Sequence, residues 1–401
     1  MGRRRAAAPH AADPAGALSA RLAFGVKQGP SASAEGLCLL WLEQADCLGE
    51  RAQLQCRSLC VTGSSMSQSI NIALIGATGN VGEALVELLE ERDFPVKDLH
   101  LLASSESAGQ SLSFRGRQVR VRSLEAFDFT QVQLAFFAAG AEVTRAYHET
   151  VLAAGCSLID LSSALPLEHA PCVLPELGIE GLPALAKPWK VSAPTPSAVA
   201  CALVLATLKP LLQPQQLQLT AMLSMSTLGR SGVQELARQT AELLNARPLE
   251  PKGVDRQVAF NVLAQVGAVD EQGHAELERR LAAEIRQLLG LPALSVAATC
   301  ALVPVFFGDS LALSVQGDAD IDITAVQQLL DGAQGIELVE AGDYPTAVGD
   351  AVGQDQVYVG RVRAGISDPR QLNLWIASDN VRKGAALNAV QIAELLIKHY
   401  L

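Results

Sequence analysis

The segment that follows Ser69 constrains the fold of this chain most strongly, because a short apolar run leads directly into a glycine-rich turn. Residues 70–75 read Ile-Asn-Ile-Ala-Leu-Ile, and 76–82 read Gly-Ala-Thr-Gly-Asn-Val-Gly. Apolar residues then recur at helical spacing through 81–92. A strand, a glycine turn and a helix in this order favour pyrophosphate binding, because the glycines allow close backbone approach and the helix start offers free N–H groups. The alternative is a tight strand–helix turn without a ligand.

The next hundred residues continue to alternate between strand and helix patterns. We expect strands at 99–103, 132–139 and 157–161, and a helix over 142–154. This alternation predicts an α/β fold whose first domain has a doubly wound parallel sheet.

Charge and hydropathy limit the classes of partner. The formal net charge is −11 and no block of basic residues occurs, which argues against nucleic acid as a partner. The mean hydropathy of +0.23 raises the question of a membrane span. However, the longest uncharged stretch, 287–308, is interrupted by Gly290, Pro292 and Pro304. We therefore expect no membrane span and assign the apolar residues to a core.

The eight cysteines show neither a C-x-x-C pair nor zinc-finger spacing with histidine, so no metal site is expected. A fold of this size needs no disulfides, and the expected location is the cytoplasm.

Residues 1–65 differ in charge and in hydrophobic patterning from the rest of the chain. They hold seven basic and five acidic residues and show no sustained hydrophobic period. Three interpretations remain open: a start placed too far upstream of Met66, which we favour, a disordered extension, or an Arg- and Ala-rich targeting segment.

Five segments together resemble the aspartate-semialdehyde dehydrogenase family in order and spacing. They read GATGNVG, FFAAGAEVTR, IDLSSAL, LPELG and, near the end, DNVRKGAALNAVQIAEL. The resemblance runs from about Met66 to Leu401. It implies a dinucleotide-binding domain formed by 66–195 and 377–401, an α+β catalytic and dimerisation domain at 196–376, and a homodimer. Residues 1–65 lie outside it.

The resemblance also implies a reaction of amino-acid biosynthesis, the NAD(P)-dependent interconversion of aspartyl-β-phosphate and aspartate β-semialdehyde. In the family a cysteine thiolate attacks and a histidine moves protons. Here Ser197 stands at the cysteine position and Asp309 at the histidine position. The family's two substrate-binding arginines correspond to Leu302 and Pro166, and its acyl-positioning glutamine corresponds to Leu223.

These five departures predict that the family reaction is lost or strongly impaired. Without the arginines, the substrate carboxylate and phosphate lose their bidentate partners. A pair formed by Ser197 and Asp309 needs strong burial to raise the pKa of the aspartate into a useful range. The alternative function is a non-catalytic NAD(P)-binding homodimer with a regulatory or partner-binding role.

Two further segments of the second domain carry residue types that suit catalysis. Cys201 lies one helical turn beyond Ser197, and we favour a buried apolar cysteine over a second nucleophile. A helical segment that in the family reads E-E-x-K keeps Glu278 and has Arg280 in place of the lysine.

The cofactor segments are intact, with one change. The family's A-S-x-R-S-A-G segment has an arginine for the 2′-phosphate of NADP, and here Glu106 occupies that position. A carboxylate repels a phosphate and accepts hydrogen bonds from ribose hydroxyls, so we expect NAD rather than NADP. The predicted cofactor-binding residues are Gly76, Thr78, Gly79, Asn80, Val81, Gly82, Ser104, Glu106, Asn380, Lys383 and Gly384.

Overall fold

The computed structural model describes residues 69–178 and 185–400. The expectations for residues 1–65 lie outside these described residues. Within them, the first sheet has six strands in the order β5-β2-β1-β6-β7-β8, and neighbouring strands pair in parallel. Its strands are β1 (Ile70–Ile75), β2 (Val96–Ala103), β5 (Arg122–Ser123), β6 (Leu134–Phe137), β7 (Ser157–Asp160) and β8 (Lys190–Ser192).

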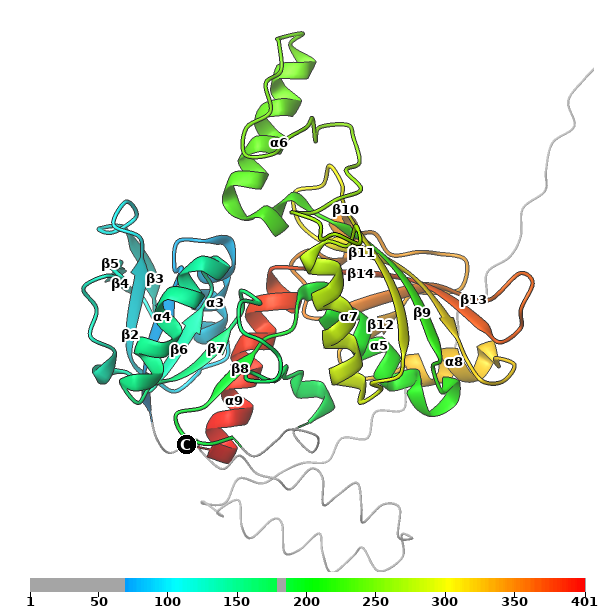
Figure 1. The fold of residues 1–401 in the computed structure, drawn as a ribbon, viewed down its shortest axis with the longest axis horizontal. Helices are drawn as coiled ribbons and strands as arrows, with labels where there is room; N and C mark the ends of the chain where they lie inside the picture. The colour runs from blue at the N-terminus through cyan, green and yellow to red at the C-terminus, as the bar shows by residue number, and fades with distance from the viewer. Residues whose placement is uncertain (1–68, 179–184, 401) are drawn as a thin grey trace, which may run out of the picture. The chain divides into compact units, whose positions relative to one another are not determined.

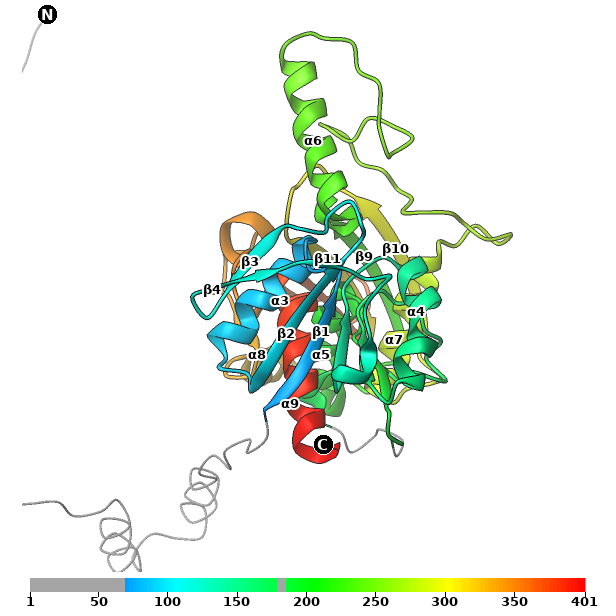
Figure 2. The ribbon, with the colours of Figure 1, turned by 90° about the vertical axis from the view of Figure 1, so that its left-hand side faces the viewer.

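Helices cover both faces of this parallel sheet. Helix α3 (Asn80–Glu91) and the final helix α9 (Asn388–Tyr400) share one apolar core with β1. Helix α4 (Ala141–Ala153) packs in a separate core on the other face, and Figure 2 shows α3 and α4 on opposite sides of β1 and β2. The predicted doubly wound sheet is therefore confirmed, as are the strand at 70–75 and the helix that begins in the glycine turn.

The second sheet is mixed and has the order β10-β9-β11-β14-β13-β12. Parallel pairing joins β10 to β9 and β12 to β13, and the other pairs are antiparallel (Figure 1). The strands are β9 (Gln216–Leu223), β10 (Ser295–Leu302), β11 (Asp309–Gln316), β12 (Ile336–Leu338), β13 (Val357–Ala364) and β14 (Gln371–Ser378). Together the two sheets confirm the expected α/β class.

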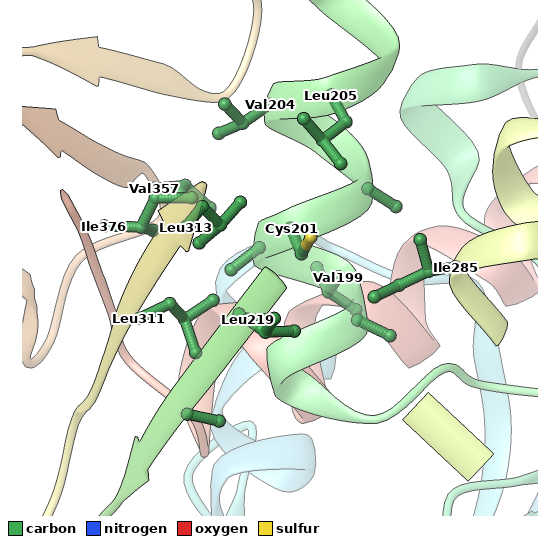
Figure 3. Packing of buried hydrophobic residues seen from close by; sticks show 14 of the residues in the cluster. Val199, Cys201, Val204, Leu205, Leu219, Ile285, Leu311, Leu313, Val357 and Ile376 are labelled. Carbon is green, nitrogen blue, oxygen red and sulfur yellow. The ribbon is translucent and has the colours of Figure 1, made fainter. Parts of the chain in front are cut away.

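One face of the second sheet is covered by α5 (Pro196–Leu212), α7 (Glu276–Leu289) and α8 (Ile323–Leu330), whose apolar residues form one core with the strands. Helix α5 is apolar almost all round, as a helix enclosed by its neighbours must be. Figure 3 shows Cys201 of α5 among Leu219 and Leu311. Cys201 is fully buried and burial raises the pKa of its thiol, so the predicted apolar role holds.

The remaining elements connect these layers. Helix α6 (Gly229–Leu244) follows β9, and a small hairpin of β3 (Ser111–Phe114) and β4 (Arg117–Arg120) follows β2. Short helical turns are η1 (Phe129–Gln131), η2 (Pro175–Leu177), η3 (Met225–Leu228), η4 (Ala347–Ala351) and η5 (Arg382–Leu387). Among residues 69–178 and 185–400, the helices are too short or too polar to cross a membrane.

Candidate functional site

The glycine turn at 76–82 is packed so closely that two of its glycines are required by the chain itself. Gly76 has φ of +88°, and a Cβ there would lie 2.6 Å from the carbonyl oxygen of Ala138. A Cβ on Gly82 would lie 2.2 Å from the carbonyl oxygen of Gly76. Gly79 is the N-cap of α3 and forms no side-chain cap, so the first N–H groups of the helix stay available to an anion.

Buried amides without partners lie beside this turn and fit a bound dinucleotide. Thr78, Asn80 and Val81 are half-buried, and the Nδ2 of Asn80 is buried without a partner among the described residues. Asn388, the first residue of α9, is fully buried, and neither atom of its amide has a partner there. Both amides lie at helix starts, Asn80 in α3 and Asn388 in α9, and their free hydrogen-bonding groups fit the polar groups of a dinucleotide. When bound, a nicotinamide dinucleotide supplies hydride transfer.

The loop after β2 carries the predicted residues for the adenosine end. Ser104 and Glu106 are exposed in this loop. A neighbouring segment runs along it, because Gly109 N–H donates to the carbonyl of Val121 at 2.9 Å. This places Arg120 beside the loop, with its Nη2 3.9 Å from the position of a Cβ on Gly109. The sequence did not show this second source of charge.

The segment that begins at Asp379 is held by internal contacts. Asn380 accepts a hydrogen bond from Gly308 N–H at 2.9 Å and donates to Ser226 Oγ at 2.9 Å. Lys383 is buried and forms an ion pair with Glu176. A Cβ on Gly384 would lie 2.5 Å from the Cβ of Pro196. These contacts explain the residue types structurally, and their role toward a cofactor stays a prediction.

Three of the five departing positions lie in one transverse row of the second sheet. Leu302 pairs with Leu223, and Asp309 pairs with Ser378, while Ser224 next to Leu223 donates to Asp309. The row consists of Leu302, Leu223, Asp309 and Ser378, and each of the four residues is at most 4% exposed. Leu223 and Leu302 belong to the core under α5 and α7. Leu311, two residues after Asp309 and on the same face of β11, belongs to it as well, so the row faces the helices. Two apolar side chains and one carboxyl therefore stand where the family has an arginine, a glutamine and a histidine.

Burial controls the chemistry of Asp309. Its Oδ1 accepts hydrogen bonds from Ser224 N–H at 2.9 Å and Ser224 Oγ at 3.0 Å. Desolvation outweighs these bonds and, with the nearby Asp379 carboxylate, raises the pKa of Asp309 to about 7. Asp309 in turn contributes to the raised pKa of the Cys300 thiol, which lies close to it. The carboxyl group is thus neutral for much of the time near neutral pH.

Ser197 lies in the first turn of α5 and is 6% exposed. No hydrogen bond joins it to Asp309 among the described residues, where Asp309 bonds to Ser224 instead. Pro196 packs on Gly384, whose N–H donates to the carbonyl of Asp379 at 2.8 Å. This chain of contacts brings the start of α5 to the end of β14, beside the row.

The basic residue at the family's lysine position is tied into a buried network. Arg280 Nε donates to Glu284 Oε1 at 2.6 Å, and its Nη1 donates to the carbonyl of Leu165 at 2.7 Å, next to Pro166. Glu284 Oε2 accepts from Thr195 N–H at 2.8 Å and Thr195 Oγ1 at 2.7 Å. Glu278 accepts from Cys300 N–H at 2.9 Å. The Glu284 carboxylate therefore joins α7 to Thr195, the residue before α5, and the guanidinium joins α7 to Leu165.

The residues that sequence reasoning missed are Ser224, Ser378, Glu284 and Asn388. Ser224, Ser378 and Glu284 owe their importance to a partner far along the chain, such as Thr195 for Glu284, and Asn388 to its buried amide without a partner among the described residues. Ser378 carries a weak signal, since it directly precedes the 379–395 segment. The other three residues can be identified only from the folded structure.

Comparison with known proteins matches both halves of the chain. Residues 71–182 match the semialdehyde dehydrogenase NAD binding domain, and 205–383 match the semialdehyde dehydrogenase dimerisation domain. The chain is 60% identical over 336 residues to a USG-1 protein homolog of Pseudomonas aeruginosa, covering 84% of this chain and 100% of the relative. It is 41% identical over 339 residues to aspartate-semialdehyde dehydrogenase 2 of Vibrio cholerae, covering 84% of this chain and 100% of the relative.

A solved structure has the same fold as this chain. The structure of a probable aspartate-semialdehyde dehydrogenase from Pseudomonas aeruginosa superimposes with a TM-score of 0.81 at 59% identity, covering 83% of this chain and 100% of that one. The first half is thus a nicotinamide dinucleotide-binding domain by its family model. Motifs, fold and relatives agree that the chain belongs to the aspartate-semialdehyde dehydrogenase family.

Proposed function

We propose that this protein is a nicotinamide dinucleotide-binding homodimer in which the family reaction is lost or strongly impaired. The observation that carries the proposal is the row of Leu302, Leu223 and Asp309. The row offers no guanidinium to a substrate carboxylate and no amide to an acyl group. A regulatory or partner-binding role for the dinucleotide complex is the function that remains.

The nearby cations support this reading because they are already paired. Arg280 is bonded to Glu284 and Leu165 through Nε and Nη1, while its Nη2 is buried without a partner among the described residues, and Lys383 is paired with Glu176. Moving either side chain toward a substrate would leave a buried carboxylate without its partner, which costs several kcal/mol. Neither side chain can therefore move to the positions of the family's arginines at low cost, and only the Nη2 of Arg280 has a hydrogen bond left to donate.

A slow dehydrogenase with Ser197 as nucleophile and Asp309 as base is the second candidate. The pKa of about 7 favours it, since a general base works best near the ambient pH. Two facts weigh against it: Asp309 Oδ1 is bonded to Ser224, and an unassisted serine hydroxyl is a weak nucleophile.

We further propose that NAD(H) binds more tightly than NADP(H), because Glu106 repels a 2′-phosphate. Arg120 lies beside the same loop, so the test must separate the two charges. In calorimetric titrations we expect Glu106→Gln to strengthen NADP(H) binding, with Glu149→Gln, an exposed carboxylate on α4, as control. Tighter binding of NADP(H) than NAD(H) by the unmodified protein would contradict the proposal and indicate Arg120 as the phosphate ligand.

The homodimer and a cytoplasmic location belong to the same proposal. The match of 205–383 to a dimerisation domain supports the dimer. Four buried, unpaired cysteines in the described chain, Cys156, Cys172, Cys201 and Cys300, suit a reducing compartment.

An activity assay tests the main proposal. Aspartate semialdehyde, phosphate and NAD or NADP are supplied to the unmodified protein and to a Ser197→Cys, Asp309→His double variant. We expect no turnover above background from the unmodified protein. We also expect the double variant to stay inactive while it still binds the dinucleotide, because the substrate-binding arginines are missing. Robust turnover by the unmodified protein would overturn the proposal.

A further inference from the structure

A surface cavity of about 290 Å³ lies at the outer edge of the second sheet, where β12 ends and β13 continues. Its lining comprises Leu338 of β12, the segment 339–344, residues 360–363 of β13 and Gln327 of α8. This lining shares no residue with the dinucleotide site or with the row. The volume lies near the lower end of the roughly 300–1,000 Å³ that small-molecule sites occupy, so it suits a metabolite of amino-acid size.

The walls of this cavity are fixed by contacts within the protein. The Nε1 of Trp375 donates to the carbonyl of Pro345 at 3.0 Å, and Val339 N–H donates to the carbonyl of Val359 at 2.9 Å. A Cβ on Gly360 would lie 2.6 Å from the Cδ of Pro345, so the segment that forms the outer wall packs directly on β13. Both ends of this wall are tied to the second sheet, and the cavity is therefore formed before a ligand arrives.

A bulge in β13 brings two arginines to the cavity. Gly360 pairs with Trp375 and Arg363 pairs with Asn373, so two residues of β13 stand opposite one residue of β14. Arg361, inside the bulge, has φ of +51°, a left-handed conformation that glycine or asparagine adopts more easily. Arg361 and Arg363 both line the cavity, and the Nη1 of Arg363 donates to the carbonyl of Arg361 at 2.7 Å. An arginine in a strained position beside a second arginine indicates a use for its charge.

The two guanidiniums have no carboxylate partner in the described part of the chain. None of the ion pairs there includes Arg361 or Arg363, whereas Arg370 and Arg382 each form one. Burial and the neighbouring Arg361 charge lower the pKa of Arg363, which shows that the two like charges are close together. Apart from the Nη1 of Arg363, the nitrogen atoms of both guanidiniums form no hydrogen bond with the described residues and are available to an anion.

Two carboxylates on the outer wall are also without a cation. Glu340 and Asp343 line the same cavity, and neither takes part in an ion pair among residues 69–178 and 185–400. The Oδ1 of Asp343 accepts from Tyr344 N–H at 2.8 Å, which orients the carboxylate and leaves Oδ2 to a ligand. A ligand with one sign of charge is attracted by one pair of side chains and repelled by the other, whereas a ligand with both charges satisfies all four.

We propose that this cavity binds a zwitterion, a free α-amino acid with an apolar side chain. Its carboxylate lies against Arg361 and Arg363, because the planar fork of a guanidinium matches a carboxylate. Its ammonium group lies against Glu340 and Asp343, and its side chain contacts the apolar residues of the lining. The lining contains no serine, cysteine, histidine or lysine, so the amino acid is held as an effector and not converted. The proposal holds whether or not the family reaction is lost.

Three probes with the same branched carbon chain test the charge rule. They are L-leucine, 4-methylpentanoate, which lacks the ammonium group, and 3-methylbutylamine, which lacks the carboxylate. Each is added to the full chain, and binding is followed by saturation-transfer NMR of the probe signals. We expect L-leucine to bind with a dissociation constant of roughly millimolar size, as suits so small a molecule, and the other two probes to bind at least tenfold more weakly. No binding of L-leucine, or equal binding of either singly charged probe, would overturn the proposal.

Variants of the arginine wall locate the carboxylate of the ligand. Arg361→Gly removes a guanidinium and gives the left-handed position the residue that adopts it most easily. We expect L-leucine binding to fall at least tenfold while the thermal unfolding midpoint stays the same or rises. Arg247→Gln, which removes an exposed guanidinium outside the lining, should bind L-leucine like the unmodified protein. A loss of binding accompanied by a lowered midpoint would show that Arg361 supports the fold and would contradict its assigned role.

Variants of the outer wall locate the ammonium group. Glu340→Gln should weaken L-leucine several-fold and leave 4-methylpentanoate bound at least as strongly as before, because only the positive group loses its partner. Glu337→Gln, an exposed carboxylate of β12 outside the lining, is the matched control and should change neither probe. Unchanged L-leucine binding by both Arg361→Gly and Glu340→Gln would place the amino acid elsewhere on the protein and overturn the proposal.

Discussion

Asp309 is a buried carboxyl group whose protonation couples the stability of the fold to pH. Burial raises its pKa from 3.8 to about 7, so between these values the folded protein holds a proton that the unfolded chain has lost. The free energy of unfolding therefore falls as pH rises through this window; the contribution is complete below the lower value and lost above the upper one. Asp309→Asn is always neutral and still accepts from Ser224. We expect it to match the unmodified protein near pH 4 and to exceed its stability by a few kcal/mol at pH 8.

Urea unfolding between pH 4 and pH 8 measures this difference. Asp331→Asn, which changes an exposed aspartate at the end of α8, is the control and should leave the pH profile parallel to that of the unmodified protein. A parallel profile for Asp309→Asn as well would show that Asp309 is ionised throughout.

The turn requires a glycine at position 82, because no side-chain atom fits there. Its missing Cβ would stand 2.2 Å from the Gly76 carbonyl oxygen, so Gly82→Ala forces the start of α3 away from β1. We expect a loss of about 1–3 kcal/mol in unfolding free energy and at least tenfold weaker NADH binding, measured by fluorescence titration. Gly140→Ala, at the N-cap of α4, is the matched control because a Cβ there meets nothing within 4 Å. Equal effects of the two variants would contradict this account.

At the scale of elements, the start of α5 is fixed by a carboxylate from α7. Glu284 accepts two hydrogen bonds from Thr195 and pairs with Arg280. Glu284→Gln leaves the guanidinium buried without its counter-charge, and we expect a loss of about 3–5 kcal/mol. Adding Arg280→Met removes the second charge and should restore most of this loss. A double-mutant cycle by urea unfolding checks the coupling, and additive losses would show that the pair is not coupled.

Local elements were predictable from the sequence, and contacts between distant elements were not. The strand at 70–75 and helix α3 follow from hydrophobic period and glycine spacing, which are local signals. The row that joins Leu302, Leu223 and Asp309 depends on strand register, which no single segment encodes. For the same reason the sequence identified Lys383 as a residue of interest and did not show its buried partner Glu176.

For the whole molecule, the uncovered face of the second sheet is the surface that a homodimer would bury. On that face Thr220 pairs with Ala312, which pairs with Trp375, and all three are at least partly exposed on interior strands. Small side chains beside a tryptophan make a flat patch that favours close packing of a second copy. Thr220→Arg with Ala312→Arg places two charges at its centre. We expect this variant to be monomeric at micromolar concentration by light scattering, whereas Glu87→Arg on α3 stays dimeric. A dimeric double variant would exclude this face as the dimer contact.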